Sequence, residues 1–304
     1  MELIRRLDSV HARDCVVTIG SFDGLHQGHQ VLIDRVRAHA ARLGVPAMMV
    51  TFEPLPREYL QAANPPARLT NFRERWRLLS GYGLERLCVL SFGERLRNLT
   101  GPQFMQLLAV AGARCVVVGH DFRFGRGGAT SAAWCAEHAA EFGFGVELVA
   151  AVPIDGERVS SGRVRSALEL GEFATARRLL GRAYSMRGRV RHGDKFGRSI
   201  GFPTANLPVK RRRTALKGVF AVRVNGPGFA GHPAVANLGT RPMVHGNEML
   251  LEAYLFDFDA DLYGQELEVE FVARLRDEAT FASMDAMVQQ MQRDAADARR
   301  VLGI

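Results

Sequence analysis

The sequence predicts two domains, an α/β domain with a parallel sheet and then an antiparallel β-barrel or meander that ends in one helix. The chain has 304 residues, and one domain usually takes roughly 150. In the first half, short apolar runs alternate with helical patterns, which is typical of parallel strands buried on both faces. In the second half, strand patterns follow one another with glycine and proline between them, which favours antiparallel pairing.

The elements of the first half begin with an apolar run at 15–20, which predicts a buried strand. Apolar residues then recur at helical spacing from 30 to 43, so a helix follows the strand. The same alternation continues along the chain, and we expect three further strands at 46–52, 84–92 and 113–119.

The hydrophobic pattern changes near Arg182, where a helical stretch ends and strand patterns begin. No helical pattern returns until 283–302, where Met284, Met287 and Met291 share the apolar face of an amphipathic helix. We therefore predict two domains, 1–182 and 183–304. The strands expected in the second domain lie at 184–190, 218–224, 234–238, 248–256 and 266–275.

The composition excludes disordered and fibrous proteins, because 47% of the residues are hydrophobic and 24% are charged. The 40 basic and 32 acidic residues give a net charge of +8, which favours an anionic partner: nucleic acid, a membrane surface or phosphorylated metabolites. The basic run 210–213 has no aromatic residues for stacking on bases, so we expect a solvated loop that steers anionic substrates and no nucleic-acid partner.

The four cysteines Cys15, Cys88, Cys115 and Cys135 have neither metal-site nor redox-motif spacing, and we expect buried thiols in a reducing compartment. The first residues lack the apolar core of a signal peptide. No segment approaches the ~20 apolar residues of a membrane span. A cytoplasmic protein without a membrane partner is the expectation.

The segment that follows the first strand, Gly-Ser-Phe-Asp-Gly-Leu-His-Gln-Gly-His at 20–29, is the sharpest signal for a binding site. It opens the first helix at the carboxyl end of a strand, where α/β sheets bind ligands and where free N–H groups attract phosphate. His26 and His29 lie three residues apart, so they share a helix face and can stabilise charge on a phosphoryl oxygen. We assign them a catalytic role, and nucleotide binding to Gly20, Phe22, Asp23, Gly24 and Gly28.

Other nucleotide motifs are absent. The chain has no GxxxxGK[ST] segment, which excludes a P-loop, and GxGxxG does not occur at this turn. The alternative for the two histidines is a solvated or turn-capping role without chemistry.

The His-x-Gly-His pattern resembles the signature of the nucleotidyltransferase superfamily, and its surroundings resemble the bacterial bifunctional riboflavin kinase/FAD synthetase family in particular. Three later segments support the resemblance. Residues 51–58 (TFEPLPRE) resemble the family's TFEPHPRE, 119–125 (GHDFRFG) its GxDFxFG, and 160–165 (SSGRVR) its SSTxIR. The resemblance implies a Rossmann-like nucleotidyltransferase domain that transfers AMP from ATP to FMN.

The last of these segments places hydroxyls and guanidiniums at a helix start, which suits a triphosphate. The resemblance implies that Ser161, Arg163 and Arg165 hold the leaving pyrophosphate, with Arg165 as a catalytic residue. Ser160 and Asp121 are further nucleotide-binding candidates, although a turn is the alternative role for Asp121.

Three positions depart from the family pattern. Leu55 replaces a histidine, Gly162 replaces a threonine, and 126–130 lacks the usual basic-small-Gly-Asp ending. Each touches the expected adenylyl-transfer site.

In the second half, Pro-Thr-Ala-Asn at 203–206 stands in a glycine-rich stretch. Thr204 and Asn206 offer oxygen ligands of the kind that Mg²⁺ takes together with phosphates, although a loop with Thr and Asx turns has the same sequence. Gly188 and Gly193 are candidates for nucleotide binding, because glycines let a ligand approach the backbone closely. Lys195, in the same stretch, is a further candidate.

The same segment resembles the PTAN motif of riboflavin kinases, a small β-barrel family, and further family motifs follow in order. The resemblance implies that Glu252 is the general base, that Thr204 and Asn206 bind the metal, and that Arg276 and Phe281 contact the flavin. The matching segments are GVFAV at 218–222, ANLGTRP at 236–242, LEAYL at 251–255, DLYG at 261–264 and LRDEATF at 275–281.

The resemblance covers about 10–300 and implies a bifunctional enzyme. It would phosphorylate riboflavin with ATP and Mg²⁺ to FMN, and then adenylylate FMN with a second ATP to FAD and pyrophosphate. We expect a monomer or weak homo-oligomer whose partners are small molecules. The alternatives are a riboflavin kinase with an impaired synthetase half, a non-catalytic flavin- or nucleotide-binding protein, and an RNA-associated basic protein.

Overall fold

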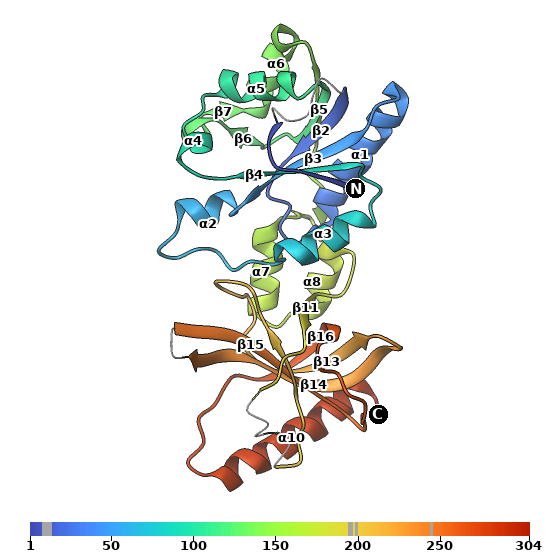
Figure 1. Cartoon of the computed structure of the whole chain (residues 1–304), viewed down its shortest axis with the longest axis vertical. Coiled ribbons are helices and arrows are strands. Elements are labelled where there is room, and N and C mark those ends of the chain that lie inside the picture. Colours follow the sequence, from blue (N-terminus) through green and yellow to red (C-terminus); the bar gives the residue numbers. More distant parts are fainter. Residues whose placement is uncertain (8–13, 194–196, 198–199, 244–245) are drawn as a thin grey trace. The chain divides into compact units, whose positions relative to one another are not determined.

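The computed structural model describes the whole chain except 8–13, 194–196, 198–199 and 244–245 (Figure 1). The chain forms two compact units, and the second unit takes in one short segment from the first half of the chain. The first unit contains Met1–Pro66 and Arg75–Ser161, and the second contains Ala67–Glu74 and Gly162–Ile304.

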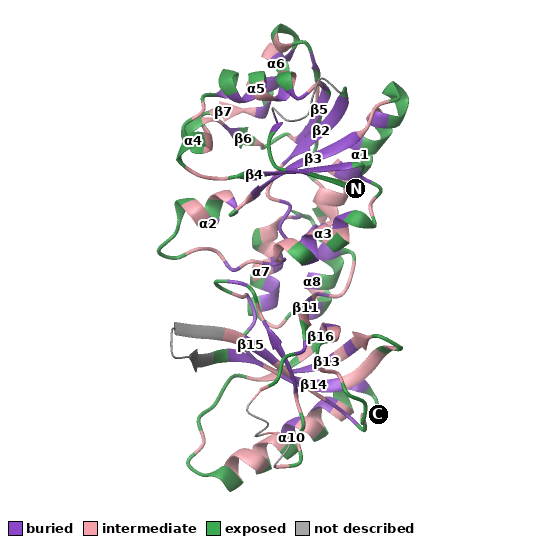
Figure 2. Ribbon diagram, in the orientation of Figure 1, coloured by how far each residue is buried: buried purple, intermediate pink, exposed green. Residues whose placement is uncertain are grey.

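The first unit is built on a parallel six-stranded sheet with the strand order β1-β4-β3-β2-β5-β8. Its four inner strands are almost entirely buried, which explains why they read as continuous apolar runs (Figure 2). The strands are β1 (Glu2–Ile4), β2 (Cys15–Ile19), β3 (Ala47–Glu53), β4 (Arg86–Ser91), β5 (Ala113–Gly119) and β8 (Gly145–Val149).

Helices cover both faces of this sheet. Cys15, Val17 and Ile19 point from β2 into the core that contains Phe104 of α5 and Cys135 of α6. Side chains alternate along a strand, so the intervening residues of β2 face the other side, where α1 contacts β2 and β3. The helices are α1 (Gln27–Leu43), α2 (Pro56–Leu60), α4 (Glu94–Arg97), α5 (Gly101–Val110) and α6 (Ala132–His138), with α3 (Phe72–Ser80) divided between the units.

Two small hairpins and two 3-10 turns complete the first unit. One hairpin lies directly after β5 and encloses a 3-10 turn, Arg126–Gly128. The hairpin strands are β6 (Arg123–Phe124), β7 (Thr130–Ser131), β9 (Pro153–Ile154) and β10 (Glu157–Arg158), and the second 3-10 turn is Ala139–Phe142.

The second unit is a nearly closed antiparallel barrel with the strand order β11-β16-β13-β14-β15-β12. The two end strands approach each other, because the N–H of Arg191, just after β11, donates to the carbonyl oxygen of Asn206 in β12 at 2.9 Å. The strands are β11 (Ser185–Arg189), β12 (Ala205–Pro208), β13 (Gly218–Gly226), β14 (Phe229–Met243), β15 (Gly246–Leu255) and β16 (Glu266–Arg276).

Three helices accompany the barrel: α7 (Ser161–Glu169), α8 (Phe173–Leu180) and α10 (Met284–Leu302). The C-terminal helix α10 packs on β13, β14 and β16, where its Ala298 and Leu302 join a small apolar core. Helix α8 ends at Gly181, which adopts a left-handed φ of 72°.

One buried ion pair corrects the expectation for the basic run 210–213. Arg211 is buried and pairs with the carboxylate of Glu74, whose other oxygen accepts a hydrogen bond from the Arg187 backbone N–H at 2.8 Å. Arg211 therefore belongs to the packing of the second unit, although its three neighbours in the run are exposed.

The expected fold class is confirmed in both halves, and every predicted strand and helix is present with ends shifted by a few residues. The strands β1, β8 and β12 and the four short hairpin strands β6, β7, β9 and β10 were not predicted. Within the described part of the chain, no helix combines the length and the apolar character that crossing a membrane requires.

Candidate functional sites in the two units

The loop between β2 and α1 turns sharply because three of its residues adopt positive φ angles, Phe22 (47°), Gly24 (84°) and Leu25 (45°). Such angles are uncommon outside glycine and often mark functional sites. Phe22 and Asp23 are buried, so their side chains shape the loop from below.

His26 is the N-cap of α1, and its Nδ1 accepts a hydrogen bond from the backbone N–H of His29 at 3.3 Å. The two imidazole rings stack with their centroids 3.6 Å apart and an interplanar angle of 16°. The expectation that the two histidines share one face of the first helical turn is confirmed. A Cβ at Gly28 would lie 3.3 Å from the His26 ring, so glycine leaves room for that ring.

His29 lies between His26 and the buried Phe22, whose ring centroid is 5.0 Å from that of His29. Its Nδ1 is buried without a hydrogen-bond partner among the described residues. Burial, the charge of a protonated His26 and the nearby Arg75 lower the pKa of His29 well below 6.5. His29 is therefore a neutral hydrogen-bond donor at physiological pH.

We expect the imidazole of His29 to stay neutral as the pH falls through the ordinary histidine range. A depressed pKa means that the folded protein resists protonation, so the His29 ring resonance should not titrate between about pH 8 and about pH 6. The measurement is an NMR titration of the histidine ring protons, with the His29 signal assigned by its loss in His29→Gln. A titration midpoint near the value of a free imidazole would contradict this placement.

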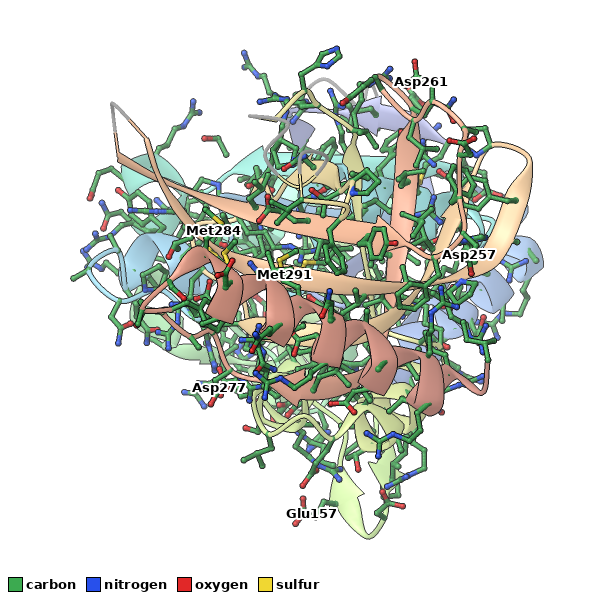
Figure 3. The ribbon with its side chains drawn as sticks, turned by 90° about the horizontal axis from the view of Figure 1, so that it is seen from below. Glu157, Asp257, Asp261, Asp277, Met284 and Met291 are labelled. Atoms are coloured by element: carbon green, nitrogen blue, oxygen red, sulfur yellow. The ribbon has the colours of Figure 1, made fainter. Side chains whose placement is uncertain are left out.

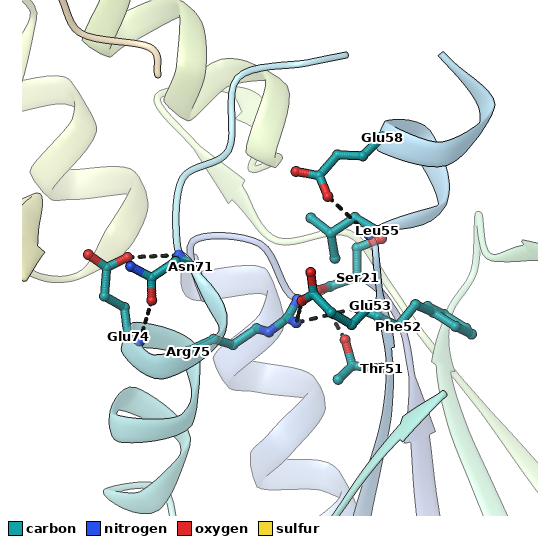
Figure 4. Close-up of polar contacts among 9 residues, drawn as sticks. All are labelled: Ser21, Thr51, Phe52, Glu53, Leu55, Glu58, Asn71, Glu74 and Arg75. Atoms are coloured by element: carbon teal, nitrogen blue, oxygen red, sulfur yellow. Dashed lines mark hydrogen bonds and ion pairs between the residues drawn. The ribbon is translucent and has the colours of Figure 1, made fainter. Parts of the chain in front are cut away.

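Arg75 supports the loop from beneath and was missed by sequence reasoning (Figure 4). Its side chain is fully buried, with Nη1 donating to the Ser21 carbonyl oxygen at 2.8 Å and Nη2 to Glu53 Oε2 at 3.1 Å. Thr51 Oγ1 donates to the same Ser21 oxygen at 3.3 Å. The partners of this guanidinium lie far from Arg75 in the sequence, so the residues around Arg75 do not indicate its role.

The segment at 158–161 meets the same loop. Ser161 Oγ donates to the Asp23 carbonyl oxygen at 2.9 Å, and this contact joins the start of α7 to the histidine loop. Ser160 is half-buried beside it.

Asp121 follows β5 as predicted and forms an ion pair with Arg158, which sequence reasoning did not foresee.

The two remaining predicted residues of this site, Arg163 and Arg165, are half-buried on α7 in the second unit. Arg165 Nε donates to the Ala67 carbonyl oxygen at 2.5 Å, so part of its guanidinium is used within that unit. Gly20, at the end of β2, packs beside Phe22, because a Cβ there would lie 3.2 Å from the Phe22 ring.

The three departures from the family pattern take different positions. Leu55 is buried at the start of α2, where its N–H donates to Glu58 Oε2 at 3.1 Å. Gly162 is exposed in the first turn of α7. Residues 126–130 contain the 3-10 turn Arg126–Gly128 and run into the first residue of β7.

The second unit contains a pocket of about 400 Å³ that opens into the barrel and is closed on one side by α10. The glycine-rich stretch, the strands and the segment after β16 all contribute to its lining. Six predicted residues come together there: Gly193, Thr204, Asn206, Glu252, Arg276 and Phe281.

Part of the pocket lining is a row of polar side chains on three adjacent strands. Glu252 of β15 pairs in register with Asn206 of β12 on one side and with Asn237 of β14 on the other. Residues opposite each other point to the same face of a sheet, and all three line the pocket. The carboxylate thus lies between two amides. This neighbourhood could not be predicted from the sequence, because residues 206 and 252 lie far apart in the chain.

Asn206 and Thr204 form the oxygen-rich end of this row. Asn206 Nδ2 donates to the Thr204 carbonyl oxygen at 3.2 Å, which leaves Asn206 Oδ1 as an acceptor. The described residues include no cluster of three His, Cys, Asp or Glu that could hold a metal by itself. The donors fit a hard cation that takes its other ligands from phosphate and water, as Mg²⁺ does.

Two predicted residues fall elsewhere. Gly188 lies within β11, where a Cβ would be 3.0 Å from the Leu207 side chain, and it is not among the described residues that line the pocket. Lys195 lies outside the described residues.

Sequence reasoning missed several lining residues because nothing in their local sequence indicates a pocket. Met287 and Met291 were predicted as an apolar helix face, and that face forms one wall. The other missed polar and aromatic residues are Phe202, Asn237, Tyr254, Tyr263, Glu278 and Asp294.

In comparisons with known proteins, two different family models match the two halves of the chain. A family model described as FAD synthetase matches residues 8–163, and one described as riboflavin kinase matches residues 180–302. A bifunctional riboflavin kinase/FMN adenylyltransferase of Pseudomonas fluorescens is 42% identical over 98% of this chain and 97% of its own length. The protein of the same name from Escherichia coli K12 is 40% identical over 100% of this chain and 99% of its own length. The crystal structure of a protein named macrolide-efflux protein from Streptococcus pneumoniae has a TM-score of 0.80 and 31% identity, over 98% of each chain.

Proposed function

The chain belongs to the bifunctional riboflavin kinase/FMN adenylyltransferase family, and from this membership we propose where and how each of its two reactions takes place. Both family domains are present, so the chain is an enzyme of flavin cofactor biosynthesis. It phosphorylates riboflavin with ATP to FMN, and it adenylylates FMN with ATP to FAD and pyrophosphate.

The kinase reaction is assigned to the barrel pocket, and the observation that carries this assignment is the row of Asn206, Glu252 and Asn237. Glu252 accepts the proton of the riboflavin 5′-hydroxyl as that oxygen attacks the γ-phosphorus of ATP. The new bond joins this oxygen to phosphorus, the bond from the γ-phosphorus to the bridging oxygen breaks, and ADP leaves. Phosphoryl transfer otherwise depends mainly on positioning and electrostatics, which an enclosed pocket supplies.

A Mg²⁺ ion is the proposed cofactor of this half. Thr204 and Asn206 would hold it through their side-chain oxygens. When bound, the ion neutralises the negative charge of the transferring phosphate. Gly193 provides the close backbone approach that a nucleotide phosphate needs, and Gly188 and Lys195 remain nucleotide-binding candidates.

The adenylyl transfer is assigned to the loop between β2 and α1. An FMN phosphate oxygen attacks the α-phosphorus of ATP, and pyrophosphate leaves. The stacked His26 and His29 donate hydrogen bonds to the charge that develops on the phosphorus-bound oxygens. The lowered pKa of His29 supports this role, because a neutral imidazole still has one N–H to donate.

Nucleotide binding at this site is proposed for the residues around the histidine pair. Gly20, Gly24 and Gly28 place no side chain between the backbone and a phosphate, while the buried Phe22 and Asp23 hold the loop. Asp121, Ser160, Ser161 and Arg163 bind further parts of ATP, and Arg165 takes charge from the leaving pyrophosphate.

Several broader assignments complete the proposal. We place the functional boundary at 182/183, between the synthetase domain 1–182 and the kinase domain 183–304. Arg276 and Phe281 contact the flavin ring. The enzyme works in the cytoplasm as a monomer or weak homo-oligomer, on small molecules, without nucleic acid or a membrane.

One incubation tests the proposal as a whole. The purified chain, given riboflavin, excess ATP and Mg²⁺, should produce FMN first and FAD afterwards, as followed by chromatography. Removal of Mg²⁺ with a chelator should stop FMN formation. Accumulation that ends at FMN would indicate an impaired synthetase half, and restoring histidine at position 55 and threonine at position 162 would then be the next step. Flavin binding without turnover would contradict both catalytic assignments.

A further inference from the structure

The C-terminal helix α10 contributes a charged residue to the pocket, and the reactions assigned above do not yet use it. Asp294 lines the pocket and is only 4% exposed, although it lies on a helix whose neighbouring residues are largely in contact with solvent. Figure 3 shows α10 across the barrel strands, with Met291 labelled on this helix. A buried carboxylate needs a partner, because an isolated charge in a protein interior is costly.

The partner of Asp294 is Arg276, the last residue of β16. Arg276 Nε donates to Asp294 Oδ1 at 2.8 Å and Nη2 donates to Oδ2 at 2.6 Å, which is a two-point contact. Gln290, one turn earlier on α10, donates to Asp294 Oδ1 at 2.8 Å and so fixes the carboxylate from its own helix.

The remaining contacts of Arg276 define which part of its guanidinium stays available. Nη1 donates to the Asp277 carbonyl oxygen at 2.9 Å, and the guanidinium carbon lies 5.7 Å from the centre of the Phe281 ring. A guanidinium has five N–H groups, and these contacts occupy three of them. The contacts among the described residues leave the other two for a ligand in the pocket.

A two-point contact with a carboxylate fixes the plane of a guanidinium as well as its position. Without it, a long side chain has many rotamers, and binding a ligand then costs the entropy of selecting one. Asp294 thus determines how Arg276 meets the pocket, although Arg276 belongs to the barrel and Asp294 to the helix that covers it.

We propose that Asp294 is a positioning residue for riboflavin, which holds Arg276 in the orientation that binds the flavin. This inference rests on the proposed function, in which Arg276 contacts the flavin ring. The helix α10 is then part of the kinase site, and its role goes beyond covering the barrel.

The first test is Asp294→Asn in the full chain, which keeps the shape of the side chain and removes its charge. The KM for riboflavin should rise about tenfold, with kcat and the KM for ATP unchanged, because a lost contact that is equal in ground state and transition state affects binding alone. Asp297→Asn is the matched control on the same helix, where Asp297 forms a surface ion pair with Arg300. It should change none of the three constants.

A double-mutant cycle distinguishes a positioning role of Asp294 from a role in stability alone. Arg276→Lys cannot form the two-point contact, so it should raise the KM for riboflavin to a similar degree. Asp294→Asn combined with Arg276→Lys should add little to either single change. If Asp294→Asn fails to fold, Arg276→Lys, on the more exposed partner, still tests the contact.

Two results would overturn the inference. One is an unchanged KM for riboflavin in either single variant, even with a lower melting temperature. The other is a cycle in which the effects of the two single changes multiply. Failure of the proposed function is distinguishable, because the wild-type chain itself would then form no FMN.

Discussion

Replacing His29 with alanine should reduce FAD formation from FMN and ATP by about 10²–10³-fold and leave FMN formation from riboflavin at its wild-type rate. The expected loss is the typical effect of removing one hydrogen-bond donor that acts on developing charge. His29 lies in the first unit and is stacked on His26 at 3.6 Å, whereas the described residues that line the pocket proposed for the kinase reaction all belong to the second unit. The two activities should therefore separate in this variant.

His39→Ala is a suitable control, because it removes another imidazole from the same helix. His39 is half-buried, and its Nε2 is in hydrogen-bond contact with the carboxylate of Glu147 in β8. We expect both activities to survive this change. Both rates are measured separately on supplied riboflavin and supplied FMN, with folding checked by circular dichroism. Equal loss of both reactions in a folded His29→Ala protein would show that the division into two sites is wrong.

The sheet of the first unit could be predicted from sequence because burial on both faces leaves a simple pattern. Strands β2, β3, β4 and β5 are almost entirely buried, and each reads as an apolar run. Strand β8 lies at the edge of the same sheet and is only partly buried, so it lacks the continuous apolar run of the inner strands. Strand β12 has only four residues and ends in proline, which is uncommon within strands, so its sequence does not predict a strand.

The candidate sites divide along a similar line. His26 and His29 could be predicted because one helical turn places them together, and the spacing of three residues is visible in the chain. Arg75 and Asp294 could not, because the ion-pair partner of each lies on a different element of the fold. An arginine or an aspartate on an amphipathic helix is ordinarily a solvated residue, and only the fold shows that these two are buried.

Asn237 illustrates a third case, in which register decides the function of a residue. The segment that contains it was recognised, yet this amide was assigned no role. Its place beside Glu252 depends on the pairing of β14 with β15, and a shift of one residue would turn it to the opposite face.

Replacing Glu252 with glutamine should reduce FMN formation from riboflavin and ATP by about 10²–10⁴-fold, while FAD formation from supplied FMN continues. Glutamine keeps the size of the side chain and its place between Asn206 and Asn237, but it cannot accept the proton of the attacking hydroxyl. The KM values for riboflavin and ATP should change little, because the substrates still fit the pocket. A loss confined to kcat is the result expected for a group that acts in the transition state.

Glu270→Gln provides the matched control for this variant. Glu270 is a half-buried strand glutamate of the same barrel, where it accepts a hydrogen bond from Asn225 at 2.9 Å and is not among the described lining residues of the pocket. Its replacement should leave kcat for FMN formation unchanged, so any loss specific to Glu252→Gln comes from the chemistry of the pocket. A Glu252→Gln protein that phosphorylates riboflavin at the wild-type rate would exclude general-base catalysis by this carboxylate. Positioning of ATP and riboflavin would then have to account for the whole acceleration.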